Sequence, residues 1–177
     1  FRAMFDHAGV GITLCPAQDR NQCWLEVNDK FCEMTGYSRE EALRLSTVDI
    51  TAPERTAGAL QDKARLLSGE VRSYVTEKRI RRKDGTWMWV ALSVATLPDA
   101  EGRPQLIIAT YQDVNARRLT EERLRAIIAA EPECVAIVAP DGRLLDMNPA
   151  GLRMLQAESL EEMRRWPFLR QVAPAYR

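Results

Sequence analysis

The stretch RRKDGTWMWV, residues 81–90, decides the fold. Lys83-Asp84-Gly85 within it is typical of a tight turn between two antiparallel strands. Segments rich in β-branched and aromatic residues flank this turn at 71–81 and 86–97, and a third follows at 105–112 after a turn at 99–102. The sequence therefore predicts three consecutive antiparallel strands.

Alternation along these strands predicts which side chains share a face. In the segment 86–97 one row is Met88, Val90, Leu92 and Val94, and the other is Trp87, Trp89, Ala91 and Ala95. In the last strand Ile107, Ala109 and Tyr111 alternate with Leu106, Ile108 and Thr110. Because both faces are apolar and helices cover only one of them, we expect the other to meet a flanking helix or a second subunit. The sequence thus predicts a homodimer.

The preceding residues predict a hairpin and then helices. Segments 10–14 and 24–28 have the composition of short strands around a polar turn. A helical pattern follows from Asp29 to Gly36, Ser38-Arg39-Glu40-Glu41 forms a capping box, and Pro53 suits the first turn of a helix over 54–67. The order β-β-α-α-α-β-β-β predicts an α+β fold, with a five-stranded antiparallel sheet and helices on one of its faces.

An internal repeat indicates a duplication. Glu26-Val27-Asn28 matches Asp146-Met147-Asn148, and Ala52-Pro53 later matches Ala173-Pro174 at nearly the same offset. Residues 113–131 between the copies are rich in helix formers. We expect the end of an upstream helix at 1–7, a complete domain at 8–115, a helical linker at 116–131 and an incomplete second domain at 132–177.

Composition excludes several classes of function. The 177 residues carry 25 Lys+Arg and 25 Asp+Glu, so no net charge draws the chain to nucleic acid or to an anionic membrane. The longest charge-free apolar run, 86–97, is shorter than the roughly 20 residues of a membrane span. The four cysteines lack the paired spacing of a metal site, which favours a reduced, cytoplasmic location.

The residues also lack the pattern of an enzyme. His7 is the only histidine, so no serine or cysteine has an evident general base. Asp49, Glu54 and Asp113 are carboxylates without catalytic partners in the sequence, which favours surface or capping roles for them. We therefore expect no catalytic activity and no metal site in this chain.

Four segments resemble a known family when they occur in this order: 27–31 (VNDKF), 35–41 (TGYSREE), 81–90 and 112–115 (QDVN). Residues 8–115 resemble a PAS domain with its C-terminal PAC half, a sensory module of bacterial signalling proteins. Residues 132–177 are similar to the front half of a second PAS domain. Tandem PAS units joined by a helix are similar to the input regions of sensor histidine kinases and diguanylate cyclases.

The resemblance implies a sensory, signal-relay and dimerisation region. Its parent is expected to be a sensor histidine kinase of a two-component system, with the catalytic domain downstream in the same chain. The alternatives are the input region of a diguanylate cyclase or phosphodiesterase, and a flavin-binding, redox-sensing PAS domain.

PAS domains bind small ligands between the concave face of the sheet and the helices. The resemblance therefore implies a pocket lined by Val27, Phe31, Met34, Ile80, Val90, Leu92, Val94 and Tyr111. A filled apolar core without a ligand is the alternative, because such rows are usually packing. Tyr111 differs from the rest because a buried phenol usually needs a hydrogen-bond partner.

The resemblance also discriminates among cofactors. Haem-binding relatives carry an axial histidine on the long helix, and 54–67 has none, so haem is not expected. Light-oxygen-voltage relatives carry a reactive cysteine where this chain has Thr47, and Ile80 and Val90 replace their polar flavin contacts, which excludes cysteinyl-flavin photochemistry. Cys32 is interpreted as a small buried hydrophobe. The pocket is thus expected to hold nothing or a non-covalent small ligand, with FAD as an alternative.

Asp113 lies where strand alternation ends and the linker helix begins. Its side chain is expected to cap the first N–H groups of that helix. By resemblance this position belongs to an Asp-Ile-Thr motif, which here is Asp113-Val114-Asn115. We predict that Asp113 transmits the signal from sheet to helix, with a plain helix cap as the alternative.

Overall fold

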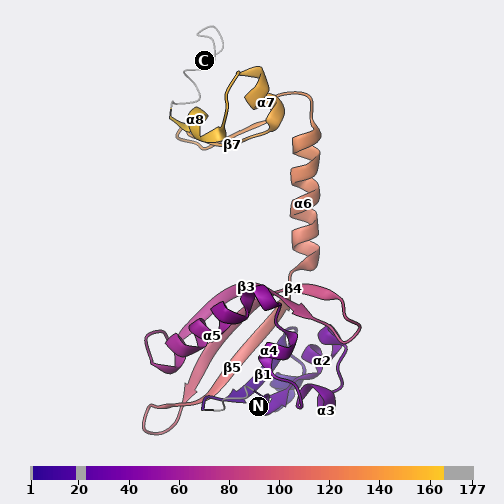
Figure 1. Ribbon diagram of the computed structural model, residues 1–177, viewed down its shortest axis with the longest axis vertical. Coiled ribbons are helices and arrows are strands. Elements are labelled where there is room, and N and C mark those ends of the chain that lie inside the picture. The colour runs from indigo at the N-terminus through magenta and orange to yellow at the C-terminus, as the bar shows by residue number, and fades with distance from the viewer. Residues whose placement is uncertain (1, 19–22, 166–177) are drawn as a thin grey trace. The chain divides into compact units, whose positions relative to one another are not determined.

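The predicted antiparallel sheet lies in the first of two units into which the chain divides, Phe1–Ala116 and Arg117–Arg177 (Figure 1). The computed structural model describes residues 2–18 and 23–165, without the side chains of 55 and 56. The expected match of 173–174 to 52–53, and the last part of the second PAS unit, lie outside the described residues. Each unit is described by itself.

The first unit has the predicted α+β composition. Its elements in chain order are α1 (Arg2–Asp6), β1 (Gly11–Pro16), β2 (Glu26–Val27), α2 (Asp29–Thr35), α3 (Arg39–Ala42), α4 (Thr47–Ile50), α5 (Pro53–Leu67), β3 (Ser73–Arg81), β4 (Trp87–Pro98) and β5 (Pro104–Asp113). The strands form one antiparallel sheet in the order β2-β1-β5-β4-β3. The last strand, β5, therefore lies at the centre of the sheet, where Tyr111 is paired with Gly11 on one side and Leu92 on the other.

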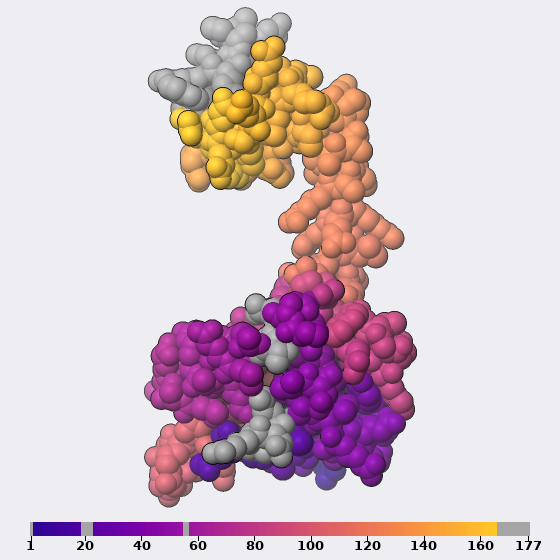
Figure 2. Space-filling model, viewed as in Figure 1, coloured from indigo at the N-terminus to yellow at the C-terminus, as the bar shows by residue number. Residues whose placement is uncertain are grey.

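The burial of the side chains confirms the predicted alternation. Met88, Val90, Leu92 and Val94 on β4 are at most 5% exposed, whereas Trp87 on the other face is 43% exposed. On β5 Ile107, Ala109 and Tyr111 are buried as well. Helices α4 and α5 lie over this inward face in Figure 1, and in the space-filling view of Figure 2 the helical side chains hide the strands behind them. The core of the unit is the layer between them.

Local signals explain where the helices begin and end. The Asn28 side chain accepts the N–H of Phe31 and so caps α2, which ends at Gly36 in the left-handed region with φ of 78°. The predicted capping box at Ser38 is present, with its Glu41 carboxylate accepting the Ser38 N–H. Pro53 occupies the first turn of α5.

Two local expectations differ from the structure. The short helix α4 was not predicted, because its capping box has an aspartate in place of the usual Glu or Gln. In this capping box the Asp49 carboxylate accepts both the N–H and the hydroxyl of Ser46. The strand expected over 24–28 is reduced to Glu26–Val27, since Cys23 instead forms an isolated bridge with Ser46 and Trp24 is buried in the core.

The second unit repeats the beginning of the first. After α6 (Asn115–Ala130) come β6 (Ala136–Val138), β7 (Leu144–Met147), α7 (Pro149–Met154) and α8 (Leu160–Arg164), the same order as β1, β2, α2 and α3. The two strands form an antiparallel pair over a small core of Leu144, Met147 and Met163. None of the helices in the described ranges is long and apolar enough to span a membrane.

Candidate functional site

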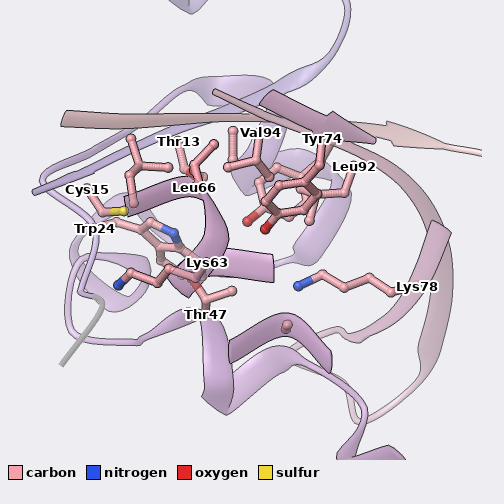
Figure 3. A pocket seen from close by; sticks show the side chains of 14 residues that line it. Thr13, Cys15, Trp24, Thr47, Lys63, Leu66, Tyr74, Lys78, Leu92 and Val94 are labelled. Carbon is pink, nitrogen blue, oxygen red and sulfur yellow. The ribbon is translucent and has the colours of Figure 1, made fainter. Parts of the chain in front are cut away.

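A cavity of about 50 Å³ lies between the inward face of the sheet and the helices of the first unit (Figure 3). Four of the five strands and two helices contribute to its wall. The residues that line it are Thr13, Cys15, Trp24, Thr47, Ala59, Lys63, Leu66, Tyr74, Lys78, Leu92, Val94, Ile107, Ala109 and Tyr111. Pockets for drug-sized ligands usually measure about 300–1,000 Å³, so this one suits water or a small molecule.

An aromatic cluster positions the phenol of Tyr111 at the wall of the cavity. The Tyr111 ring meets the Phe31 ring edge to face at 5.0 Å between centroids, and Phe31 meets Trp24 in the same way at 5.0 Å. Such edge-to-face contacts favour one ring orientation. The Tyr111 hydroxyl forms a hydrogen bond with the side chain of Thr13, so this buried phenol has the partner that it was expected to need.

Two phenols at the cavity keep their protons at neutral pH. Burial raises the pKa of Tyr111 far above its ordinary value, and the hydrogen bond with Thr13 offsets only part of that rise. Burial, with a smaller contribution from Asp62, raises the pKa of Tyr74 to about 12. Both hydroxyls can therefore donate a hydrogen bond to a ligand.

Lys78 is a buried charged residue on the inward face of the sheet. It lies on β3 opposite Val90 and is only 2% exposed. Its Nζ donates to Thr51 Oγ1 at 2.9 Å, and the Thr51 hydroxyl in turn donates to the Thr47 carbonyl at 2.6 Å. Placing an ammonium group in an apolar layer is costly unless polar groups surround it. The Thr51–Thr47 chain provides such polar groups.

The structure divides the eight predicted pocket residues into two groups. Leu92, Val94 and Tyr111 line the cavity. Val27, Phe31, Ile80 and Val90 are fully buried in the adjoining core, and Met34 packs against that core. Which of them contact a ligand remains a prediction.

The junction between sheet and linker lies at the end of β5. Asp113 Oδ1 accepts the N–H of Asn115, the first residue of α6, at 2.8 Å, and its other carboxylate oxygen lies 3.6 Å from Arg82. The Asn115 side chain accepts the N–H of Trp89 on β4 at 3.1 Å. The start of α6 is therefore bonded both to the end of β5 and to the neighbouring strand.

The groups considered as cofactor ligands are separate from one another. His7 is exposed, and no cluster of three or more His, Cys, Asp or Glu suited to a metal ion occurs in the described part of the chain. None of the four cysteines forms a disulfide. Cys32 is half-buried, and this burial raises the pKa of its thiol, which makes it less reactive at neutral pH. Thr47, which aligns with the photoreactive cysteine, does line the cavity.

Sequence reasoning did not identify the polar wall of the cavity. Tyr74 and Lys78 lie four residues apart on β3, and the alternation that was applied to β4 would have placed both inward. Lys63 is on α5 and Thr13 on β1. For these two, tertiary packing was needed to bring them to the same space.

This fold and cavity define a sensory module of the kind that binds a small molecule or relays a signal. The family model described as "PAS fold" matches residues 25–111, and that described as "PAS domain" matches residues 122–177. The chain belongs to the PAS family, with one complete PAS unit followed by part of another.

Proteins similar to the chain include bacterial signalling proteins. The chain is 32% identical over 122 residues to the probable diguanylate cyclase DgcE of Escherichia coli K12, covering 69% of this chain and 11% of that protein. It is 26% identical over 127 residues to the sensor histidine kinase TmoS of Ectopseudomonas mendocina, covering 72% and 13%. A domain of a sensor histidine kinase/response regulator from Geobacter sulfurreducens has 28% identity and a TM-score of 0.53, covering 63% of this chain and 90% of that one. The chain thus spans little more than a tenth of these two full-length relatives.

Proposed function

We propose that the first PAS unit is the sensory input of a longer signalling protein and that α6 carries its signal onward. One observation carries this proposal. The central strand β5 contributes Ile107, Ala109 and Tyr111 to the cavity and ends at Asp113, one residue before α6 begins at Asn115. A change in the cavity that displaces β5 displaces the start of α6 as well.

The similar proteins indicate which kind of output domain to propose. We propose a sensor histidine kinase of a two-component system as the parent, with the sensory unit at 8–115, the linker at 116–131, the second PAS unit at 132–177 and the kinase in the same chain. The second candidate is a diguanylate cyclase or phosphodiesterase. The 32% identity to a probable diguanylate cyclase favours it. In either case catalysis belongs to that other domain.

The ligand that we propose is small and non-covalently bound. Leu92, Val94 and Tyr111 would contact it, with the other predicted pocket residues packed behind them. The alternative, FAD, needs far more room than the 50 Å³ between these side chains, so the present arrangement disfavours it. Haem would need a histidine on α5, whose sequence has none.

We further propose that the unit acts as a cytoplasmic homodimer through the outer face of its sheet. On that face Trp87 is 43% and Val75 74% exposed, and Ile12, Trp89 and Ile108 are only partly covered. Exposed apolar side chains in adjacent strands favour association with a partner surface. The four cysteines form no disulfide, which suits a reducing compartment.

The relay through α6 is tested by changing the phase of this helix in the full-length protein. One alanine inserted after Glu122 rotates the following residues by about 100°, whereas seven inserted residues restore the phase to within about 20°. We expect the single insertion to abolish the response of the output domain to its stimulus and the seven-residue insertion to preserve it. Equal responses from both variants would contradict a relay through a rigid helix.

A further inference from the structure

We propose that the cavity of the first PAS unit is a receptor site for a small organic carboxylate, whose anionic group is bound by Lys78 and the phenol of Tyr74. The proposal rests on the proposed sensory function and specifies its ligand class. It starts from the distribution of charge at the wall. Among the described residues that line the cavity, two are lysines and none is an aspartate or glutamate.

Lys78 brings a buried positive charge to the cavity. Its side chain is 2% exposed, and Figure 3 shows its amino nitrogen pointing inward, toward the space beside Tyr74 and Thr47. Its ammonium group donates to Thr51 Oγ1, and ammonium donors also suit the oxygens of a carboxylate. In a site with little water, its attraction for an anion is stronger than at the protein surface. A carboxylate in the cavity would therefore meet a cation that already faces it.

The wall of the cavity also supplies neutral donors. Tyr74 lies four residues before Lys78 on the same face of β3, and Tyr111 lies on β5, so both phenols reach the cavity from the inward face of the sheet. Because both stay protonated at neutral pH, they donate to an anion rather than repel it. A charge-assisted hydrogen bond from such donors to a carboxylate is stronger than one between neutral groups.

Much of the remaining wall is apolar. Leu66, Leu92, Val94, Ile107 and Ala109 are among the apolar residues that line it. They suit a short hydrocarbon body attached to the anionic group, and a cavity of about 50 Å³ limits that body to a few carbon atoms. The wall thus matches a short-chain or compact monocarboxylate better than a sugar, a nucleotide or a second anionic group.

Lys63 and Asp62, both on α5, also affect the electrostatic potential near the cavity. Lys63 is half-buried, and in Figure 3 its amino nitrogen is turned toward the side of Trp24, away from that of Lys78. Asp62 interacts electrostatically with Tyr74. We therefore assign Lys63 a smaller part in binding than Lys78.

The test is isothermal titration calorimetry of the full chain at constant ionic strength. The probes are sodium acetate, propionate and butyrate, each compared with its amide of nearly the same shape. We expect at least one carboxylate to bind and its amide to bind roughly tenfold more weakly or not at all. No heat with any carboxylate, or equal affinity for acid and amide, would overturn the proposal.

Variants locate the site. Lys78→Met should weaken carboxylate binding by roughly tenfold or more, whereas Lys30→Met, which removes an exposed lysine paired with Glu33, should leave it unchanged. If Lys78→Met does not fold, Tyr74→Phe is used to test the site. It should weaken carboxylate binding about threefold or more, because the variant lacks the phenol donor. Unchanged affinity in the folded variant overturns the proposal. These titrations do not involve an output domain, so their failure would leave the relay through α6 intact, and failure of the relay would leave the titrations unaffected.

Discussion

Asn28 and Asn148, 120 positions apart, make equivalent hydrogen bonds in the two PAS units. In each unit the side-chain oxygen caps the following helix, by accepting from Phe31 N in the first and from Gly151 N in the second. The same oxygen also accepts the N–H of Ile12 in the first unit and of Val135 in the second. The amide nitrogen donates to the carbonyls of Phe5 and Val10 in the first unit, and to those of Ile128, Glu131 and Glu133 in the second.

This relationship has a structural consequence for both units. The carbonyls that receive the amide hydrogens include Phe5 in α1 and Ile128 in α6, so each asparagine joins the helix that enters its unit to the helix that follows the hairpin. The repeat found in the sequence therefore extends to hydrogen bonds of the same type.

We expect Asn28→Ala to lower the free energy of unfolding by about 3 kcal/mol, because it removes a helix cap and leaves several buried backbone groups without a partner. Asn28 is fully buried, so water cannot replace the lost bonds. Urea denaturation measures this loss. Ser38→Ala, which removes an exposed cap, is the control, and it should cost about 1 kcal/mol. Equal losses in the two variants would refute the structural weight assigned to Asn28.

For Asn148→Ala we expect a local effect. Amide hydrogen exchange should accelerate in β6, β7 and α7, while the sheet of the first unit keeps its protection, because the bonds that are lost lie within the second unit. Accelerated exchange throughout β4 and β5 would argue against two separately stabilised units.

Lys78 and Thr51 should respond oppositely to apolar substitution. Lys78→Met removes a buried amine and keeps its volume, so stability should be unchanged or raised by up to about 2 kcal/mol. Thr51→Val removes an acceptor of the buried Lys78 amine, so stability should fall by about 1–3 kcal/mol. Thermal denaturation of the two variants checks this, and a large loss in Lys78→Met would mean that Lys78 is needed for folding.

The buried phenols predict a loss of stability in alkali. The pKa of Tyr74 is about 12 in the folded chain and about 10 in the unfolded one. Because this pKa is higher in the folded chain, folding favours the protonated phenol. The resulting contribution to the free energy of unfolding is fully present below about pH 10 and is lost as the pH rises from about 10 toward 12. Tyr74→Phe should therefore have a flatter dependence of its urea midpoint on pH in this window than the unsubstituted chain. Identical slopes would show that Tyr74 ionises as readily in the folded chain as in the unfolded one.

The fold followed from the sequence because several local signals agreed. The turn at 83–85, the alternation of β4 and β5 and the capping box at Ser38 all predict the same arrangement, and each of them depends on nearby residues. The same alternation predicted the apolar residues that line the cavity. It did not predict the polar ones, since Lys63 and Thr13 reach the cavity only through the packing of α5 and β1 in the folded unit.

Association through the outer sheet face is tested by light scattering at micromolar concentration. We expect a mass of two chains for the unsubstituted protein and of one chain for Ile108→Lys, because a charge in the middle of an apolar interface is costly to desolvate. Ser93→Lys, on the same face but at an exposed polar position, is the milder control. A monomer in the unsubstituted protein would exclude the proposed dimer.

The central claim is that the signal leaves the first unit at the junction of β5 and α6. Its most direct test is the stimulus response of the full-length protein carrying Asp113→Ala, measured as output activity, beside the control Asp99→Ala. Asp99 accepts the N–H groups of Glu101 and Arg103 in the turn between β4 and β5, so both substitutions remove a backbone cap of about 0.5–2 kcal/mol, but only Asp113 lies at α6. We predict that Asp113→Ala abolishes the response while the PAS unit remains folded, and that Asp99→Ala retains it. An intact response in Asp113→Ala, with the same loss of stability, would contradict the claim and make Asp113 a helix cap alone.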